Sequence, residues 1–306
     1  MLEIDSNGFR TAHQAGVIKN NMLIDCHVHC GLGQFRGLKR SEIEDDLAVE
    51  AMKNLIQSYH IKGVQAIRDG GDGSGIGIIL RDISKDSDLI FKTPIHALYK
   101  KGHYGDFLGD SVDDVKDGIK KMNRLIKQKP DFIKIILTGI MSFTTFGTSG
   151  AVGFSKSECT EMIDHAHQKG LSVMVHANTP EGIMIALTSG ADTIEHGYGI
   201  NDDCLHAMRE CGVVWVPTLA PFANIARCDA GSPMKEYQEV SEAYFRQHQL
   251  MVKKAAAMGV NIALGSDSGA TMVPLGQGTL DELGFLLDCG LTKEILESIG
   301  KWVIDL

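Results

Sequence analysis

Short apolar segments alternate with longer amphipathic segments along almost the whole chain. Eight of the apolar segments lack internal alternation of apolar and polar positions, which is typical of parallel strands covered on both faces. They are residues 22–28, 63–69, 94–100, 132–137, 171–176, 192–196, 213–218 and 260–265. Eight strand–helix units spread over about 250 residues are the number found in a (β/α)8 TIM barrel. The pattern therefore predicts an α/β fold of that type.

Three of the intervening segments carry the signals of helix ends. Residues 41–60 begin with a Ser-x-x-Glu capping box, residues 111–126 begin with a Ser cap, and residues 155–170 end at a glycine. No linker or low-complexity stretch interrupts the alternation. We therefore expect a single domain over residues 1–306, with the barrel itself at about 22–290.

Composition and charge narrow the range of partners. The chain carries 30 Lys and Arg against 39 Asp and Glu, a net charge of −9, without any run of five basic residues. A phosphate backbone or an anionic membrane needs a basic surface, so we expect neither as a partner. No apolar stretch is long enough to span a membrane, and the first residues do not form a signal peptide. We expect a cytoplasmic protein with a small-molecule substrate, and homo-oligomer formation stays open.

The seven cysteines are an odd number scattered over a long chain. That is not the dense, even framework of a disulfide-rich secreted protein. Cys26 and Cys30 are four residues apart, but no second cysteine pair follows at the spacing of a zinc finger. We therefore expect reduced thiols.

Groups that can bind a metal lie at the ends of the predicted strands, where the active sites of such barrels are found. Side chains two residues apart on a strand share a face, so those of His27 and His29 point together and can bind one ion side by side. The other candidates at strand ends are Lys134, His176, His196 and Asp267. A polar group on each of several strands would be costly without a shared partner. This set favours a metal site.

A second His-x-His pair shows that the pattern alone does not identify a metal site. His165 and His167 match the same His-x-His pattern but lie in a segment with helical spacing. Positions two apart on a helix diverge by about 200°, so these side chains cannot hold one ion. We predict that they face solvent.

Lys134 allows three interpretations from the residues alone. It can be a strand lysine that extends to the mouth of the barrel, or the Schiff-base lysine of an aldolase. In the third, CO₂ converts the amine to a carbamate whose two oxygens bridge two divalent cations. The surrounding histidines make the third interpretation the most economical.

The sequence resembles the amidohydrolase superfamily of metal-dependent hydrolases. The similarity rests on Asp25-x-His27-x-His29, on Lys134 in the fourth strand, and on three later strand-end residues, His176, His196 and Asp267. Segments such as IRDGGD (67–72), VMVHANTPEGI (173–183) and LGSDSG (264–269) are similar to the branch with imidazolonepropionase-like enzymes and metal-dependent Xaa-Pro dipeptidases.

That resemblance implies a binuclear metal centre. His27, His29 and Asp267 would hold one ion, and a second would be held by His176 and His196. Carboxylated Lys134 would bridge the two ions, for which Zn²⁺ suits nitrogen and oxygen ligands best.

The resemblance also implies a reaction. A hydroxide bridging the two metals would attack the amide carbonyl, and Asp267 would act first as general base and then as general acid. The substrate would be a dipeptide, an N-acyl amino acid or a cyclic amide. His103 and Tyr198, which follow the third and sixth strands, are candidate substrate contacts. Most members of the branch carry a β-sandwich built from both termini, which we expect to be absent or truncated here.

Three alternatives stay open. A mononuclear deaminase of this superfamily would use a Glu near the fifth strand, where this sequence has His176-Ala177-Asn178. An aldolase would use Lys134 without needing four clustered histidines. A catalytically silent scaffold would be expected to have lost some of the ligands, all of which are present.

Overall fold

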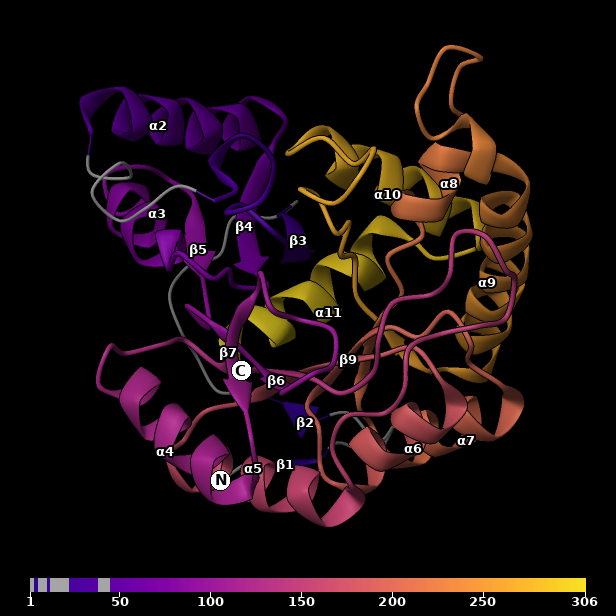
Figure 1. Ribbon diagram of the computed structural model, residues 1–306. Helices are drawn as coiled ribbons and strands as arrows, with labels where there is room; N and C mark the ends of the chain where they lie inside the picture. Colours follow the sequence, from indigo (N-terminus) through magenta and orange to yellow (C-terminus); the bar gives the residue numbers. More distant parts are fainter. Residues whose placement is uncertain (1–2, 5–9, 12–21, 38–44) are drawn as a thin grey trace.

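Helices surround a central group of parallel strands in the computed structural model (Figure 1). The structure describes residues 3–4, 10–11, 22–37 and 45–306. The strands form two parallel sheets. The first has the order β3 (Leu23–Val28), β4 (Val64–Asp69) and β5 (Ile90–Lys92). The predicted α/β architecture with parallel strands is confirmed.

The second sheet has seven strands. In spatial order they are β12 (Asn261–Ile262), β11 (Val214–Val216), β10 (Thr193–His196), β9 (Val173–Ala177), β8 (Ile133–Ile136), β6 (Ala97–Lys100) and β7 (Gly109–Val112). Each of the eight predicted strand segments overlaps one of the strands of these two sheets. The sequence pattern missed β5 and β7, because β5 has only three residues and β7 lacks an apolar run.

Backbone hydrogen bonds join β3 to the segment that follows β12. The amide of Cys26 donates to the carbonyl of Leu264 at 2.8 Å, and the amide of Asp267 donates to the carbonyl of His27 at 2.8 Å. On the other side, β5 pairs with β4 while β6 pairs with β8, and Pro94 lies between β5 and β6. The described strands are thus assigned to two sheets rather than one, and a closed eight-stranded barrel stays a prediction.

A short antiparallel pair precedes these sheets. Strands β1 (Glu3–Ile4) and β2 (Arg10–Thr11) pair through two residues each. We expected the flanking sandwich to be absent or truncated, and this pair of two-residue strands does not contradict that prediction. Two-residue strands carry too little apolar pattern to be recognised in a sequence.

Ten α-helices in the described part of the chain pack around the sheets. They are α2 (Asp46–Ile61), α3 (Ile76–Ser84), α4 (Val115–Ile126), α5 (Lys156–Gln168), α6 (Pro180–Thr188), α7 (Asp202–Cys211), α8 (Ala220–Ala226), α9 (Gln238–Met258), α10 (Gln277–Asp288) and α11 (Lys293–Asp305). Two short 3₁₀ helices, η1 (Gly33–Phe35) and η2 (Lys235–Tyr237), lie in connecting loops.

The helix-end signals had mixed outcomes. The side chains of Ser155 and Glu158 form a reciprocal capping box at α5, whose predicted end at Gly170 is confirmed by a left-handed φ of 74°. Ser111 does not cap α4, because it belongs to β7, and Asp114 accepts the capping hydrogen bond instead. The capping box predicted at residues 41–44 lies outside the described residues, and α2 has Asp45 as its N-cap.

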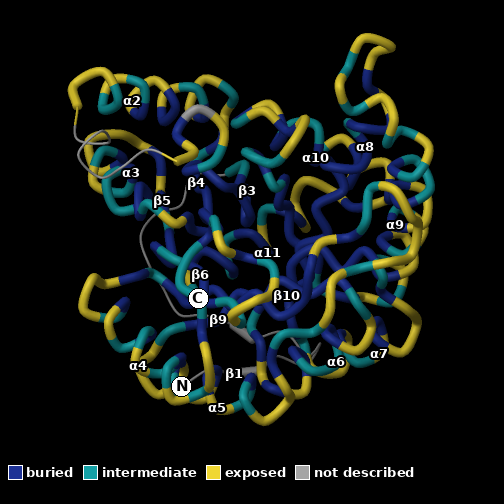
Figure 2. The backbone as a smooth tube through the Cα atoms, viewed as in Figure 1, coloured by how far each residue is buried: buried dark blue, intermediate teal, exposed yellow. Residues whose placement is uncertain are grey.

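The core lies between the strands and the inner faces of the helices, whereas exposed residues gather on the outer faces (Figure 2). Trp215 is fully buried there and donates its indole N–H to the carbonyl of His196 at 2.9 Å. All seven cysteines are free thiols, as predicted, and only Cys211 is exposed. Within the described ranges, no helix combines the length and apolar character needed to cross a membrane.

Candidate metal centre

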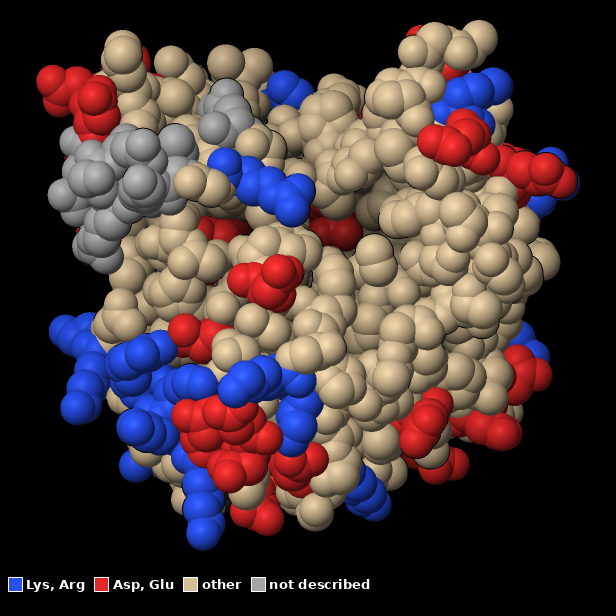
Figure 3. Space-filling model, viewed as in Figure 1, with Lys and Arg blue, Asp and Glu red and all other residues tan. Residues whose placement is uncertain are grey.

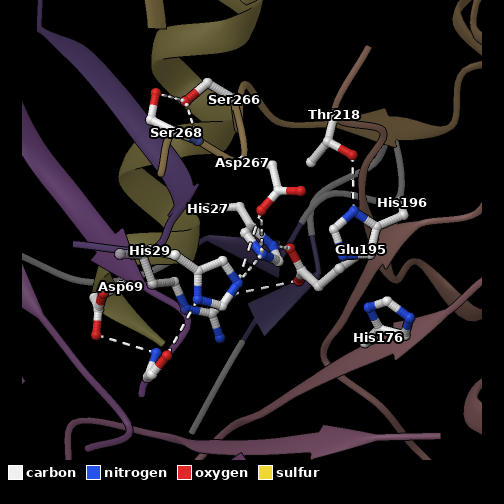
Figure 4. Close-up of polar contacts among 12 residues, drawn as sticks. His27, His29, Asp69, His176, Glu195, His196, Thr218, Ser266, Asp267 and Ser268 are labelled. Carbon is white, nitrogen blue, oxygen red and sulfur yellow. Dashed lines mark hydrogen bonds and ion pairs between the residues drawn. The ribbon is translucent and has the colours of Figure 1, made fainter. Parts of the chain in front are cut away.

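Three predicted ligands come together at the end of β3 and in the segment that follows β12. The Nε2 atoms of His27 and His29 lie 3.3 Å apart. Oδ1 of Asp267 lies 3.6 Å from Nε2 of His27 and 3.7 Å from that of His29. In Figure 4 the Asp267 carboxylate points toward both rings. One ligand atom from each residue falls within 4.8 Å of the others, close enough to share an ion.

Both β3 histidines present the nitrogen that an ion requires. Nδ1 of His29 lies 3.1 Å from the carbonyl of Gly71, an acceptor, so this nitrogen carries the proton. Nδ1 of His27 lies 2.5 Å from a carboxylate oxygen of Glu195 and is protonated for the same reason. Each Nε2 therefore keeps a free lone pair. Metal-binding histidines commonly donate their second N–H to a carboxylate or a carbonyl in this way.

The second pair of predicted histidines lies beside the first. The rings of His176 and His196 have centroids 4.6 Å apart, and those of His27 and His196 are 4.8 Å apart. Nδ1 of His196 lies 2.8 Å from Oγ1 of Thr218. Nε2 of His176 lies 3.3 Å from the carbonyl of Gly139. The four histidines thus form one continuous cluster (Figure 4).

Lys134 is buried in β8 with only 1% of its surface exposed. Its Nζ atom is fully buried and has no hydrogen-bond partner in the described part of the chain. Burial lowers the pKa of Lys134 to about 8, and the carboxylates of Glu195 and Asp267 oppose that shift. A buried ammonium group without a partner is costly, so this amine needs either neutralisation or a ligand.

Burial keeps the imidazoles neutral. It lowers the pKa of His29 and of His176 to about 3, and the charge of Lys134 adds to both shifts. The pKa values of His27 and His196 are lowered well below the usual range, again mainly by burial. Only neutral imidazole binds a metal, so the cluster is in the correct protonation state at neutral pH.

Sequence reasoning missed the role of Glu195. This fully buried carboxylate in β10 accepts hydrogen bonds from His27 and from the Thr193 hydroxyl. Nη1 of Arg68 lies 3.9 Å from Oε1 of Glu195 and donates to Thr193 Oγ1 at 3.0 Å. Arg68 thus forms a buried ion pair with Glu195. Asp69, the next residue, instead accepts hydrogen bonds from the backbone amides of Cys30 and Gly71.

Asp25 was also given no role beyond its place in the motif. Its carboxylate accepts the Thr279 hydroxyl at 2.6 Å, and the Ser266 amide and hydroxyl at 2.9 and 2.6 Å. The bonds to Ser266 connect β3 to the segment that carries Asp267, and the bond to Thr279 connects β3 to α10, so Asp25 helps to fix the position of Asp267. Burial nonetheless raises the pKa of Asp25 to about 6.

A cavity of about 280 Å³ opens above these groups. His29, Lys134, His176, His196 and Asp267 lie among its lining residues. The space-filling view shows a hollow between the α2 side and the α8–α10 side, with an acidic side chain deep inside it (Figure 3).

The two candidate substrate contacts differ in position. Tyr198 lines the cavity, is 8% exposed, and donates its hydroxyl proton to the carbonyl of Thr218 at 2.6 Å. His103 is exposed and does not line the cavity; its Nδ1 lies 3.3 Å from the carbonyl of Lys101. Direct substrate contact by either residue stays a prediction.

His165 and His167, the second His-x-His pair, lie on α5, which confirms that this pair belongs to a helix. Nε2 of His165 lies 2.9 Å from Oδ1 of Asn123, and Nε2 of His167 lies 2.8 Å from Oδ2 of Asp192. His167 is exposed, but His165 is half-buried, so the prediction of solvent exposure holds only for the former.

Fold and site together define an α/β protein with a histidine–aspartate cluster, arranged so that it could hold a metal ion, at the carboxyl ends of parallel strands. Comparison with known families identifies the class further, because the model of the amidohydrolase family matches residues 23–294. The chain therefore belongs to the amidohydrolase family, and it is a hydrolase that acts on carbon–nitrogen bonds.

Individual relatives are distant. An uncharacterized protein of Mycobacterium tuberculosis is 25% identical over 289 residues, which cover 91% of this chain and 70% of the relative. Ochratoxinase of Aspergillus niger is 24% identical over 184 residues, 60% of this chain and 36% of the relative.

Two solved structures share the fold. A Xaa-Pro dipeptidase with bound methionine has a TM-score of 0.73 at 21% identity, covering 93% of this chain and 75% of the other. The A. niger ochratoxinase structure has a TM-score of 0.68 at 20% identity, covering 91% and 68%. At these identities the likeness supports the fold alone.

Proposed function

We propose that this chain hydrolyses amide bonds with the help of two divalent metal ions. His27, His29 and Asp267 would bind one ion, and His176 and His196 the other. Carboxylated Lys134 would bridge the two. The observation that carries the proposal is the fully buried Nζ of Lys134, which finds no hydrogen-bond partner among the residues that the structure describes although it lies among neutral imidazoles and a carboxylate.

The residues fit the ions that the family implies. A carbamate on Lys134 would replace the buried, unpaired ammonium by an anion that needs cations beside it. Hydrogen bonds to Glu195 and Gly71 direct the Nε2 lone pairs of the β3 histidines toward Asp267. Divalent ions held there supply Lewis acidity and a water acidic enough to attack an amide at neutral pH, and Zn²⁺ suits the ligands best.

Asp267 is the residue that moves protons. Burial raises the pKa of Asp267 to about 7, and the charge of Lys134 opposes the rise. A bound cation would lower this pKa, so in the metal-loaded site the carboxylate would be ionised and could take a proton from the attacking water and return it to the leaving nitrogen. Its side chain is 15% exposed and lines the cavity, within reach of a bound substrate.

The substrate would be a small amide, such as a dipeptide, an N-acyl amino acid or a cyclic amide. The names of two structural neighbours, Xaa-Pro dipeptidase and ochratoxinase, support this class. The site cavity of about 280 Å³ lies slightly below the usual range for small-molecule pockets. In keeping with one domain, we propose that the two sheets act together as the predicted barrel.

Metal analysis combined with an activity screen tests this proposal. Protein expressed with adequate metal should contain roughly two divalent ions per chain and hydrolyse at least one member of a panel of dipeptides, N-acyl amino acids, lactams and hydantoins. Bicarbonate should speed reconstitution of the metal-free protein. A metal content near zero, with no activity gained from Zn²⁺, Mn²⁺ or Co²⁺, would refute the metal-dependent mechanism.

One observation favours a second candidate. A buried lysine with a pKa of about 8 is also what a Schiff-base enzyme requires. In that case borohydride and a carbonyl compound would trap a covalent adduct on Lys134 in protein without metal. Mass spectrometry of the trapped protein separates the two functions.

A further inference from the structure

Two groups of side chains above the metal cluster differ in chemical character. One contains Arg36, Tyr104 and Phe107, whose contacts run from the end of η1 to the loop after β6. The other is apolar and contains Phe143 and Phe222, with ring centroids 5.5 Å apart. Pro221, Ile225, Ile140 and Met141 extend the second group along the cavity. The cavity therefore has a cationic side and an apolar side.

Among the described residues that line this cavity, Arg36 and Lys134 are the cations. The guanidinium of Arg36 lies 5.0 Å from the centroid of the Phe107 ring, so one face is covered by that ring. Among the residues that the structure describes, no carboxylate forms an ion pair with Arg36. Figure 3 shows basic side chains beside the hollow on its α2 side. A guanidinium at a cavity without an ion-pair partner among the described residues is a ready binding group for a carboxylate.

Tyr104 links Arg36 to the proton-transfer side of the site. Burial raises the pKa of Tyr104, the charge of Asp267 raises it further, and the charge of Arg36 opposes the rise. Tyr104 therefore remains a neutral phenol. The charges of Asp267 and Arg36 both act on its hydroxyl group. Its ring centroid also lies 5.5 Å from that of His176. The cationic side is thus next to the residue that would protonate the leaving nitrogen.

We infer that the substrate is an N-acyl amino acid or dipeptide with a free α-carboxylate, that Arg36 binds this carboxylate, and that Phe143 and Phe222 receive an apolar acyl group. The inference rests on the proposed function. Water adds its oxygen to the acyl carbon and the C–N bond breaks. The products are a carboxylate and an amino acid whose nitrogen has gained two protons, one through Asp267 and one from the newly formed acid. Because the amino acid leaves as the amine, its carboxylate belongs on the Asp267 side.

A matched pair of substrates tests the role of Arg36. N-benzoylglycine carries the carboxylate, and N-benzoylglycinamide replaces it by a neutral amide of the same shape. Wild-type holoenzyme should release benzoate from the acid with about 10²-fold higher kcat/KM, since hydrogen bonds to charged groups contribute that much. Arg36→Gln should lower kcat/KM for the acid about 10²-fold, mainly through KM, and leave the amide unaffected. Arg36→Lys should recover part of the loss.

Two controls separate this role from a structural one. Arg209 is an exposed arginine on α7 that does not line the cavity, so Arg209→Gln should leave both substrates unchanged. N-acetylglycine tests the apolar side and should be at least about tenfold poorer than N-benzoylglycine, because it buries less apolar surface. Equal use of acid and amide by the wild type, or an Arg36→Gln variant as active as the wild type on the acid, would overturn the assignment of Arg36. Equal use of the acetyl and benzoyl compounds would overturn the acyl side.

A binding measurement separates this inference from the proposed function. N-benzoylglycine can be titrated by NMR into the metal-free wild type and Arg36→Gln proteins, where no hydrolysis is needed. Binding that weakens at least about tenfold in the variant supports the carboxylate site even if no substrate is cleaved. Equal binding by the two proteins overturns it. Hydrolysis that is absent from every metal-loaded sample would instead refute the proposed function.

Discussion

Replacing Glu195 by Gln tests whether a carboxylate outside the ligand set controls the metal site. Glu195 accepts the Nδ1 proton of His27 at 2.5 Å, which fixes the tautomer whose Nε2 faces His29 and Asp267. An amide at this position can present an N–H to Nδ1 and favour the wrong tautomer. Loss of such a carboxylate–histidine contact usually weakens metal binding by about 10- to 100-fold. We expect a decrease of this size for one of the two ions.

The same substitution also removes the ionic partner of Arg68. Removing one member of a buried pair costs about 3 kcal/mol or more, but this pair is long, at 3.9 Å. Arg68 also keeps its bond to Thr193 and its contact with the Phe132 ring at 4.1 Å. We therefore expect the free energy of unfolding to fall by about 3 kcal/mol at most. Metal affinity must be measured at a temperature where the variant is fully folded.

The matched control is the carboxylate–histidine pair formed by Asp192 and His167. Asp192 precedes β10 and lies 2.8 Å from Nε2 of His167, at the end opposite to the cluster. Asp192→Asn makes the same chemical change without touching a ligand. Competition with a chromogenic chelator should show wild-type metal affinity for Asp192→Asn and weakened affinity for Glu195→Gln. Equal affinities in the two variants would show that the His27–Glu195 contact does not tune the site.

Three further predictions concern single residues. Asp267→Asn should keep the fold, measured by circular dichroism, and lower kcat by about 10²-fold or more, whereas His165→Asn should change kcat little; equal losses would contradict the distinction between strand and helix histidines. Lys134→Ala should lose metal and activity together, and Lys134→Glu should retain some metal by elemental analysis, because a carboxylate can partly replace the bridging carbamate. Burial lowers the pKa of His248 from 6.5 to about 4, so the unfolded chain binds a proton at this residue more tightly than the folded chain does. The free energy of unfolding therefore falls as the pH drops from about 6.5 to about 4. Urea unfolding at pH 7 and pH 5 should show a loss about 2 kcal/mol smaller for His248→Gln than for the wild type, and an unchanged pH dependence would refute this origin.

The strand ligands could be predicted because their positions follow from local periodicity. His27 and His29 share a face of β3, and their Nε2 atoms meet at 3.3 Å as the two-residue period requires. Trp215 and the Val residues of β11 likewise follow from apolar runs. Each of these inferences needs only the repeat of a strand and the rule that parallel strands end at one edge.

The supporting contacts could not be predicted because they join residues far apart in sequence. Glu195 and His27 are separated by 168 positions, and Asp25 and Thr279 by 254. Arg36 and Phe107 meet through two loops whose shapes no periodicity describes. Glu195 did carry one usable signal: it lies two residues after Thr193 on a buried strand, and a charged side chain there needs a partner.

His196 shows why the alternation of faces along a strand could not predict every residue of the cluster. Glu195 and His196 are consecutive, so a regular strand would point them to opposite faces. Both nevertheless reach the cluster, because His196 has a φ of +67° that turns the chain out of the strand. Thr218, with a φ of +52°, and Asp267, with a φ of +56°, follow the same rule. Such conformations cost non-glycine residues on the order of 1 kcal/mol each or more.

Buried hydrogen bonds around these three residues offset that cost. Trp215 holds the carbonyl of His196, and Asp267 donates its amide to His27. Just beyond Thr218, the fully buried carboxylate of Glu282 accepts the amides of Leu219 and Ala220 at 3.0 and 2.7 Å. Because each strained residue has rigid support on a neighbouring element, the ligand side chains keep their direction without a metal to hold them. Ile95, Lys129 and Met272 also have positive φ values, but His196, Thr218 and Asp267 are the ones that carry or support groups at the cluster, which is where a hydrolase of this family needs a fixed geometry.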